Sequence, residues 1–295
     1  MKNLGNGYLV PRFFGLVAVT ALLAGCSSGA TLSQPDLSLL GKPVSTSFSP
    51  VNDGFYFANF EAAQYRETFA KSDLIAMVGT NDKVCVGGKA IPCRLTPGAE
   101  KVIKTVNDSR RWGNCEGFIV IAAARYNLKA VPTTSALAPD HTTLKAIIRA
   151  FATMFLPEVQ AESRTYSAET LSDNVAVLTA ALKTGKLEYG LGLYTKKGGH
   201  EVLPYAIRYP TKDLARISVY DSNWPQRQRF VDINLKTQKW SFSFAGNDPL
   251  KDPKAWSGGQ SDLALNSNQS RIDGLTKRLG AHVKPTGPLW QTVTN

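Results

Sequence analysis

Cys115 is the residue of this chain whose setting most favours covalent chemistry. It follows the short polar run from Arg110 to Asn114, and an apolar helical pattern begins at once with Phe118 and Ile119. A cysteine at a helix N-terminus lies near unpaired backbone N–H groups and in the positive field of the helix dipole, which favour the thiolate. Arg110 and Arg111 add to that field. Taken alone, Cys115 is equally well explained as a small buried hydrophobic residue.

Two residues further along the chain can complete a catalytic site. His200 opens an expected strand directly after two glycines, and Asp221 ends the next expected strand. If these strands pair as a hairpin, the start of one lies beside the end of the other, so the two side chains should be neighbours. A thiolate nucleophile, an imidazole base and a carboxylate that orients the imidazole are what acyl transfer requires. Asn223 is the alternative orienting residue.

Each of the two partners also has a simpler explanation. His200 alone fits a strand-end histidine bonded to backbone, and Asp221 alone fits a turn former before Ser-Asn-Trp-Pro. The order and spacing of all three residues favour the catalytic interpretation. His141 and His282 have no comparable setting, and we expect them at a helix start and on the surface.

The elements that must position these residues follow from the hydrophobic periodicity. Helical patterns cover 59–71, 97–106, 115–126, 141–155 and 173–183, and short strands are expected within 73–95. Alternating patterns separated by turn residues then predict an antiparallel meander of strands at 187–194, 200–209, 215–220, 229–235 and 239–244. A helical first half and a β second half predict an α+β fold.

The N-terminus has the pattern of an export signal. Lys2 and Arg12 form its positive region, and 13–23 is apolar but too short to span a bilayer. Leu-Ala-Gly-Cys at 23–26 resembles the bacterial lipobox, in which the cysteine, here Cys26, is acylated and becomes the mature N-terminus. Ser27 after it, rather than Asp, predicts sorting to the outer membrane if the source is Gram-negative, with the protein facing the periplasm.

The domain organisation follows from these patterns. We expect a signal peptide at 1–25, a flexible Ser-, Thr-, Gly- and Pro-containing tether at 26–49 and one catalytic domain at 50–247. Residues 248–295 are polar and predict a loop-rich C-terminal extension with one helix near 269–279.

The four cysteines fall into three roles in this interpretation. Cys26 takes the lipid, and Cys85 and Cys93 flank a Gly-Gly turn, where an oxidising periplasm favours a disulfide. A metal site there is disfavoured because no histidine or further cysteine lies nearby. Cys115 remains as the odd thiol, which marks it as reactive.

The net charge of +11 falls to +9 when Lys2 and Arg12 of the signal are removed. Nucleic acid is an implausible partner, because no Lys/Arg run or aromatic interleaving accompanies the charge. A basic surface fits anionic lipid or cell-wall polymer, and it fits solubility alone equally well. With no metal-ligand cluster and no phosphate loop in the sequence, we expect no cofactor and no metal.

Cys115, His200 and Asp221 together resemble the papain-like cysteine peptidases, most closely the bacterial branch with the double-glycine-leader (bacteriocin-processing) peptidases. That branch has a cysteine, then Gly-His followed by apolar residues and Tyr, then Tyr-Asp-Pro-Asn-like residues about twenty positions on. The resemblance covers about 107–244. Trp112-Gly113-Asn114-Cys115 is also similar in residue type to the Trp-Gly-Ser-Cys of papain, although the tryptophan's place differs.

The resemblance implies a papain-like fold with Cys115 as nucleophile, His200 as general base and then acid, and Asp221 as the orienting group. It implies a lipid-anchored hydrolase of the cell envelope that cleaves peptide amide bonds through a thioester. One position departs from the pattern: the glutamine expected six residues before the cysteine is Ser109, with Asn107 two residues earlier. These two are the candidate oxyanion donors, and loss of one such donor costs on the order of a hundredfold in rate.

Two other functions remain open on the same fold. Asn-Cys-Glu-Gly-Phe at 114–118 is similar to the Asp-Cys-Ser-Gly-Phe of peptidoglycan-cleaving cysteine amidases, which favours a cell-wall amidase or acyltransferase. Those enzymes usually have a second histidine where this chain offers Asp221. The missing glutamine favours instead an inactive, papain-like binding lipoprotein.

Overall fold

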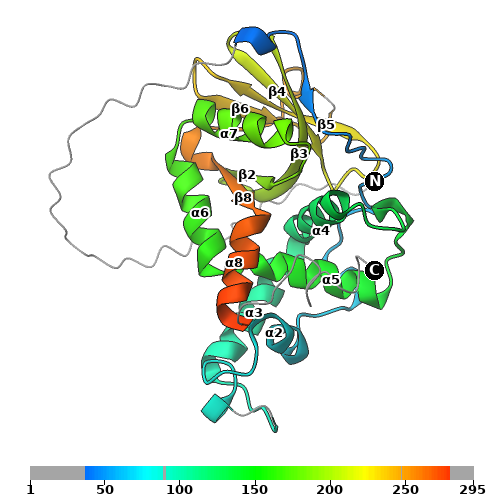
Figure 1. Ribbon diagram of the computed structural model, residues 1–295, viewed down its shortest axis with the longest axis vertical. Helices are drawn as coiled ribbons and strands as arrows, with labels where there is room; N and C mark the ends of the chain where they lie inside the picture. Colours follow the sequence, from blue (N-terminus) through cyan, green and yellow to red (C-terminus); the bar gives the residue numbers. More distant parts are fainter. Residues whose placement is uncertain (1–36, 89–90, 247, 280–295) are drawn as a thin grey trace, which may run out of the picture.

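The fold is α+β, as the sequence predicts. A computed structural model describes residues 37–88, 91–246 and 248–279. Most of the helices form one half of the molecule and the antiparallel sheet forms the other (Figure 1). In chain order the helices are α1 (Ala62–Tyr65), α2 (Lys71–Val78), α3 (Pro97–Ser109), α4 (Cys115–Leu128), α5 (His141–Ala152), α6 (Pro157–Ala168), α7 (Leu171–Lys183) and α8 (Asn268–Leu279).

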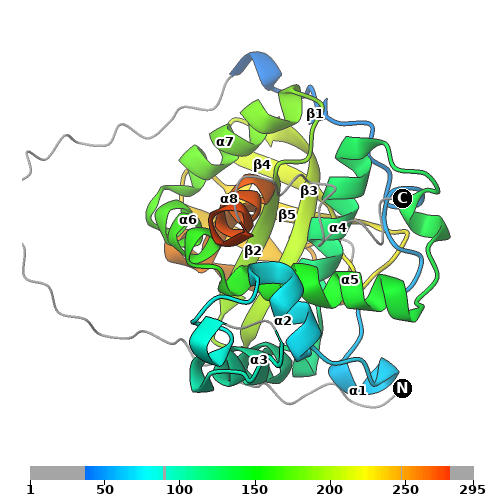
Figure 2. The same cartoon turned by 60° about the horizontal axis from the view of Figure 1, so that its bottom comes forward.

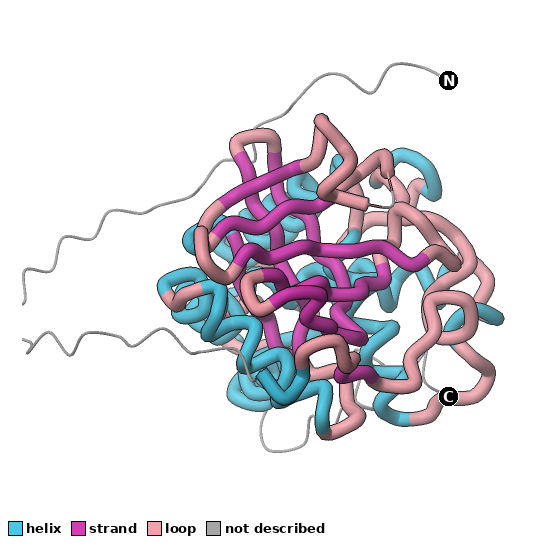
Figure 3. The backbone as a smooth tube through the Cα atoms, turned by 90° about the horizontal axis from the view of Figure 1, so that it is seen from above, coloured by secondary structure: helices cyan, strands magenta, loops and turns pink. Residues whose placement is uncertain are grey.

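The sheet is a curled antiparallel meander with one strand added at its end. Its order is β7-β6-β5-β4-β3-β2-β8, and β1 pairs with β3 outside this path. The strands, seen from above in Figure 3, are β1 (Val44–Ser45), β2 (Tyr189–Thr195), β3 (Gly198–Thr211), β4 (Leu214–Tyr220), β5 (Gln228–Asn234), β6 (Lys239–Phe242), β7 (Trp256–Gly258) and β8 (Leu263–Ser267). The five strands expected between 187 and 244 are therefore present, in the predicted order.

Helix α4 lies between two hydrophobic cores. Ile119, Ala122 and Ala123 belong to the core formed by the sheet and α7. Phe118 and Ile121 belong to the core formed by the helices. Every residue of α4 from 116 to 125 is buried, which is expected of a helix with no polar face. Helix α4 therefore lies where the two halves of the fold meet, between the sheet and α5 (Figure 2).

Gly117 allows α4 to pack closely on α5. A Cβ atom at this position would lie 2.1 Å from the backbone oxygen of Ile147. Only glycine fits there, so the turn that carries Cys115 is held against α5 by backbone contact.

The expectation of a flexible tether at 26–49 is wrong for its second half, residues 37–49. Residues 1–36 lie outside the described residues, but the chain from Leu37 onward is attached to β3. Val44 and Ser45 pair with Ile207 and Ala206, and the Phe48 ring is buried in the sheet core. The strand pairing and the burial of the Phe48 ring hold this segment on the sheet, although its composition is typical of turns and loops.

The described part of the C-terminal segment, 248–279, is likewise part of the fold and not a loop-rich extension. Strand β8 pairs with β2 along its whole length, and α8 lies beside α6 (Figure 1). The predicted helix near 269–279 is present as α8. The strand was missed because all five residues of β8 are buried, so no polar alternation marks it.

Two further expectations differ from the structure. The segment at 73–95 begins within α2, and its described residues (73–88 and 91–95) form an isolated bridge between Cys85 and Leu95 but no strands. Helix α6 was not predicted, since Val159 is its one buried residue and no apolar stripe marks it. Among the described residues, no helix combines the length and apolar character needed to cross a membrane.

Candidate active site

His200 and Asp221 are in direct contact inside the fold. Strands β3 and β4 are antiparallel with Leu203 opposite Tyr220, which places the start of β3 beside the residue that follows β4. The Nε2 atom of His200 lies 2.8 Å from Oδ1 of Asp221. The side chains are 4% and 0% exposed, so water does not compete for this contact. The hairpin argument from sequence is confirmed for this pair.

The Asp221 carboxylate is held by its own turn. Its Oδ1 also accepts the backbone N–H of Asn223 at 2.9 Å. Its other oxygen, Oδ2, is buried and has no hydrogen-bond partner among the described residues. Asn223, the alternative orienting residue, instead has its side-chain carbonyl bonded to Asn59. The residue that orients His200 is therefore Asp221.

The environment of His200 favours the imidazolium. Burial lowers the pKa of the ring, but the charge of Asp221 and hydrogen bonds to Asp221 and Cys115 outweigh it and raise the pKa to about 10. Two aromatic rings pack on the imidazole, Phe244 at 5.1 Å and Phe242 at 5.8 Å between centroids. Since Nε2 contacts Asp221, the ring nitrogen left for Cys115 is Nδ1.

Cys115 is the first residue of α4 and a half-buried free thiol. Its side chain lies near enough to the His200 ring to be among the groups that raise the pKa of that ring. A thiol at this end of a buried helix also has the unpaired N–H groups of the first turn beside it. The structure thus brings together all three residues expected from the sequence, Cys115, His200 and Asp221.

Asn59 joins the two segments that carry these residues. Its Oδ1 accepts the backbone N–H of Asn114 at 2.7 Å, and its Nδ2 donates to the side chain of Asn223 at 3.0 Å. Its backbone N–H donates to Ser222 at 2.8 Å. The side chain lies against Gly113, where a Cβ would be 2.4 Å from Nδ2. No local pattern marks Asn59, because its role depends on contacts with residues far along the chain.

The two arginines before Cys115 have different roles. Arg110 is fully buried, and its Nε donates to the side chain of Asn114 at 2.7 Å. Burial lowers its pKa to about 10. Arg111 is exposed and forms an ion pair with Asp108. The expectation that Arg111 adds to the positive field at Cys115 is therefore wrong. Arg110 acts chiefly by fixing the turn that leads into α4.

The two candidate oxyanion donors, Asn107 and Ser109, lie in the last turn of α3, before the turn that leads to Cys115. Both N–H groups of the Asn107 amide are used, since Nδ2 donates to the backbone oxygens of Phe69 and Ile103. Asn107 is therefore a structural residue that joins α3 to the segment before α2. Ser109 is half-buried at the last position of α3. The backbone N–H of Cys115, at the start of α4, is the oxyanion donor that the helix itself provides.

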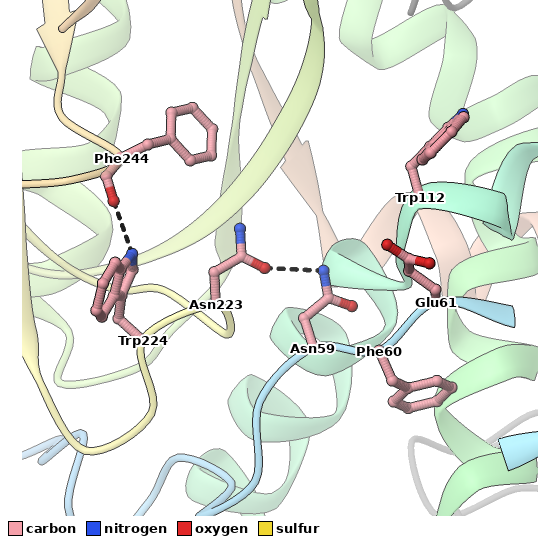
Figure 4. A pocket seen from close by; sticks show the side chains of 7 residues that line it. All are labelled: Asn59, Phe60, Glu61, Trp112, Asn223, Trp224 and Phe244. Atoms are coloured by element: carbon pink, nitrogen blue, oxygen red, sulfur yellow. Dashed lines mark hydrogen bonds between the residues drawn. The ribbon is translucent and has the colours of Figure 1, made fainter. Parts of the chain in front are cut away.

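A pocket of about 390 Å³ opens next to these residues (Figure 4). The Asn59–Asn223 hydrogen bond crosses it between two aromatic groups. One group consists of Trp224, in the turn after β4, and Phe244, which follows β6. The other consists of Phe60, before α1, and Trp112, before α4. Its lining residues are Asn59, Phe60, Glu61, Trp112, Asn223, Trp224 and Phe244. Phe244 packs on the His200 ring, and the backbone N–H of Asn223 donates to Asp221, so the pocket adjoins the His200–Asp221 pair.

The remaining predicted sites have separate outcomes. The Cys85–Cys93 disulfide is present, with its Cα atoms 5.1 Å apart. The candidate lipidation site Cys26 and His282 lie outside the described residues. His141 is the first residue of α5 and bonds Glu67 at 2.7 Å with its side chain exposed. Among the described residues, no cluster of His, Cys, Asp or Glu is arranged to hold a metal ion.

No protein-family model, curated protein or solved structure matches this chain.

Proposed function

We propose that the protein is a lipid-anchored cysteine hydrolase of the cell envelope, with a papain-like arrangement, that cleaves peptide amide bonds through a thioester on Cys115. The observation that carries the proposal is the buried His200 imidazole, which is bonded to the Asp221 carboxylate and lies near enough to Cys115 for that side chain to help raise its pKa. A thiol, an imidazole and a buried carboxylate in this order are the parts that nucleophilic acyl transfer needs.

Each step follows from the charge states at the site. The thiolate of Cys115 attacks the amide carbon and forms a C–S bond, while the backbone N–H at the start of α4 binds the oxyanion. The His200 imidazolium then gives its proton to the leaving amine as the C–N bond breaks. Water next attacks the thioester, His200 takes the water proton, and the acid leaves as the thiolate reforms. The raised pKa of His200 supports the imidazolium form at neutral pH.

The aromatic pocket beside the site supports a peptide substrate. Trp112 and Trp224 line opposite parts of it, and Phe244 connects it to the His200 ring. Aromatic surfaces that remain accessible next to a nucleophile suit an extended chain with apolar side chains. The single acidic lining residue, Glu61, adds one position at which a cationic group of the substrate is favoured.

The location in the cell envelope has two supports. One is the export and lipobox pattern at the N-terminus. The other is the Cys85–Cys93 disulfide, since disulfides persist mainly in oxidising compartments. The identity of the third catalytic residue favours a peptidase over a cell-wall amidase, because Asp221 and not a second histidine contacts His200.

Labelling and hydrolysis together test the proposal. Purified full-length protein is treated with iodoacetamide at pH 7, and the label is located by peptide mass mapping. We expect stoichiometric labelling of Cys115 and at least a hundredfold slower labelling in His200→Ala, since the imidazole no longer stabilises the thiolate. His141→Ala is the matched control, because His141 also pairs with a carboxylate but on the surface.

The substrate is tested with the same variants on two materials. We expect release of new amino termini from an unstructured protein such as casein, and none with Cys115→Ala. Release of stem-peptide fragments from purified sacculi, without cleavage of casein, would instead support the amidase. A Cys115 thiol that is no more reactive than a free cysteine, with no cleavage of either material, would overturn the hydrolase and leave a binding lipoprotein.

A further inference from the structure

A buried carboxylate lies directly beside the candidate nucleophile. Glu116 is the second residue of α4 and is 5% exposed. A negative charge next to Cys115 disfavours a second one on the sulfur, and burial strengthens this repulsion because water is absent. The sequence alone therefore has a conflict: the helix start favours a thiolate, and the residue after it opposes one.

Arg271 on α8 compensates this charge. Its Nη2 lies 2.5 Å from Oε1 of Glu116, and the arginine side chain is 1% exposed. Its Nη1 donates to Oγ1 of Thr153 at 2.6 Å, so the guanidinium is fixed from two sides. Residue 271 lies in the segment expected from sequence to be a loop-rich extension, which makes α8 part of the site's surroundings.

A second buried carboxyl group lies in the same region without a cation of its own. Glu201 follows His200 on β3, is 3% exposed, and has both oxygens bonded to Nδ2 of Asn266 at 3.2 Å. Burial, and then the charge of Glu116, raise its pKa well above the usual value, although Arg271 and Asn266 act in the opposite direction. An uncharged Glu201 adds no further repulsion at Cys115.

We propose that Arg271 is a positioning residue that cancels the charge of Glu116 inside the fold and so keeps the neighbouring Cys115 sulfur reactive. This inference rests on the proposed role of Cys115 as nucleophile. It extends the site to α8, because the state of the sulfur then depends on a residue more than 150 positions away. The charged or titratable groups near Cys115 and Glu116 include His200 and Glu201 on β3, Asp221 after β4, Tyr194 on β2, Arg271 on α8 and, behind the turn, Arg110.

The pH dependence of Cys115 labelling by iodoacetamide tests this proposal, with full-length protein and peptide mapping. Glu116→Gln leaves the Arg271 charge uncompensated, so we expect the midpoint of labelling to fall by about one pH unit. Arg271→Met leaves Glu116 without its partner, so the midpoint should rise. The double variant E116Q/R271M should return it close to that of the parent protein.

Shifts in opposite directions that cancel in the double variant are the signature of charge. Shifts in the same direction, or no shift in E116Q, would overturn the proposal. If Arg271→Met does not fold, E116Q and the double variant decide alone. Arg271→Lys keeps the positive charge but not the two guanidinium nitrogens that bond Glu116 and Thr153. We expect the labelling midpoint of this variant to stay near that of the parent protein. Glu201→Gln should leave the midpoint unchanged, and a fall of one pH unit would contradict an uncharged Glu201.

The matched control is the other Arg–Glu pair of α8. Arg278 bonds Glu158 of α6 at 2.9 Å, so Arg278→Met loosens α8 without changing the charge beside Cys115. We expect its labelling midpoint to be unchanged, and a shift as large as that of Arg271→Met would indicate a merely structural effect. Because labelling and not cleavage is measured, opposite shifts without any amide hydrolysis would retain this inference and reject the hydrolase.

Discussion

The Asn59 amide donates a hydrogen bond of 3.0 Å to the side-chain carbonyl of Asn223. The same amide accepts the backbone N–H of Asn114 at 2.7 Å. One side chain from the segment before α1 thus joins the turn after β4, which carries Asp221, to the turn before α4, which carries Cys115. The distance between carboxylate and thiol across the two halves of the fold therefore depends on Asn59.

Asn59→Ala tests this connection. Removing the amide leaves the buried Asn114 N–H without its acceptor, which costs about 1–3 kcal/mol of unfolding free energy. The two turns then lose their common anchor, so we expect Cys115 labelling at pH 7 to slow by about ten- to a hundredfold, because a shift of about 1 Å between reacting groups can cost up to about a hundredfold in rate. Urea denaturation and the iodoacetamide rate measure the two effects.

Asn127→Ala separates the loss of an anchor from the loss of stability. The Asn127 side chain makes two backbone hydrogen bonds to Leu187, of 2.8 and 2.9 Å, at the other end of α4. We expect a similar loss of stability and an unchanged labelling rate. Equal slowing in both variants would show that Asn59 contributes only to general stability.

The His200–Asp221 pair predicts a specific pH dependence of stability. The pKa of His200 is raised from 6.5 to about 10 in the folded protein, because Asp221 and Cys115 outweigh burial. The folded state therefore holds the proton more tightly than the unfolded state. The resulting stabilisation, on the order of a few kcal/mol, is complete below about pH 6.5 and is lost as the pH rises toward 10.

Asp221→Asn isolates this effect from other titrations. We expect the unfolding free energy of the parent protein to fall more steeply between pH 6.5 and 10 than that of the variant, measured by urea denaturation at several pH values. The difference between the two proteins should be largest at the acidic end. Parallel curves would mean that Asp221 does not stabilise an imidazolium in the folded protein.

The candidate catalytic residues were predictable because local patterns fix their positions. The helix start at Cys115 follows from an apolar run after a Gly-containing turn, and the alternation of β3 and β4 fixes which residues begin and end a hairpin. His200 and Asp221 then become neighbours whatever the rest of the fold does.

The supporting residues were not predictable because long-range contacts determine them. Asn59 has no motif of its own, and its expected helix at 59–71 is broken between α1 and α2. Asn266 and Ser267 are polar yet buried in β8, because they bond the carboxyl groups of Glu201 and Glu162. From sequence alone, such polar residues are typical of loops, because their buried partners are not apparent. The sequence therefore does not predict that the C-terminal segment contributes a strand to the sheet.

The Cys85–Cys93 disulfide should contribute stability without affecting the site. Its cysteines are eight positions apart, and closing so short a loop in the unfolded chain is worth about 2–3 kcal/mol. We expect Cys85→Ser with Cys93→Ala to lower the unfolding free energy by about this amount. The labelling rate of Cys115 should stay unchanged, because both cysteines of the disulfide lie in the segment between α2 and α3 and not in the candidate site. A slowed rate would show coupling between the two regions.

Gly190 on β2 provides the space that Glu201 needs. A Cβ atom at position 190 would lie 2.2 Å from Oε1 of Glu201, so Gly190→Ala forces the buried carboxyl group off Asn266. We expect a loss of about 1–3 kcal/mol, as for other overpacked interiors. In a Glu201→Ala background the same substitution meets no carboxyl group and should cost clearly less, which a double-mutant cycle by urea denaturation measures. Equal costs in both backgrounds would mean that Gly190 is required for the backbone of β2 and not for Glu201.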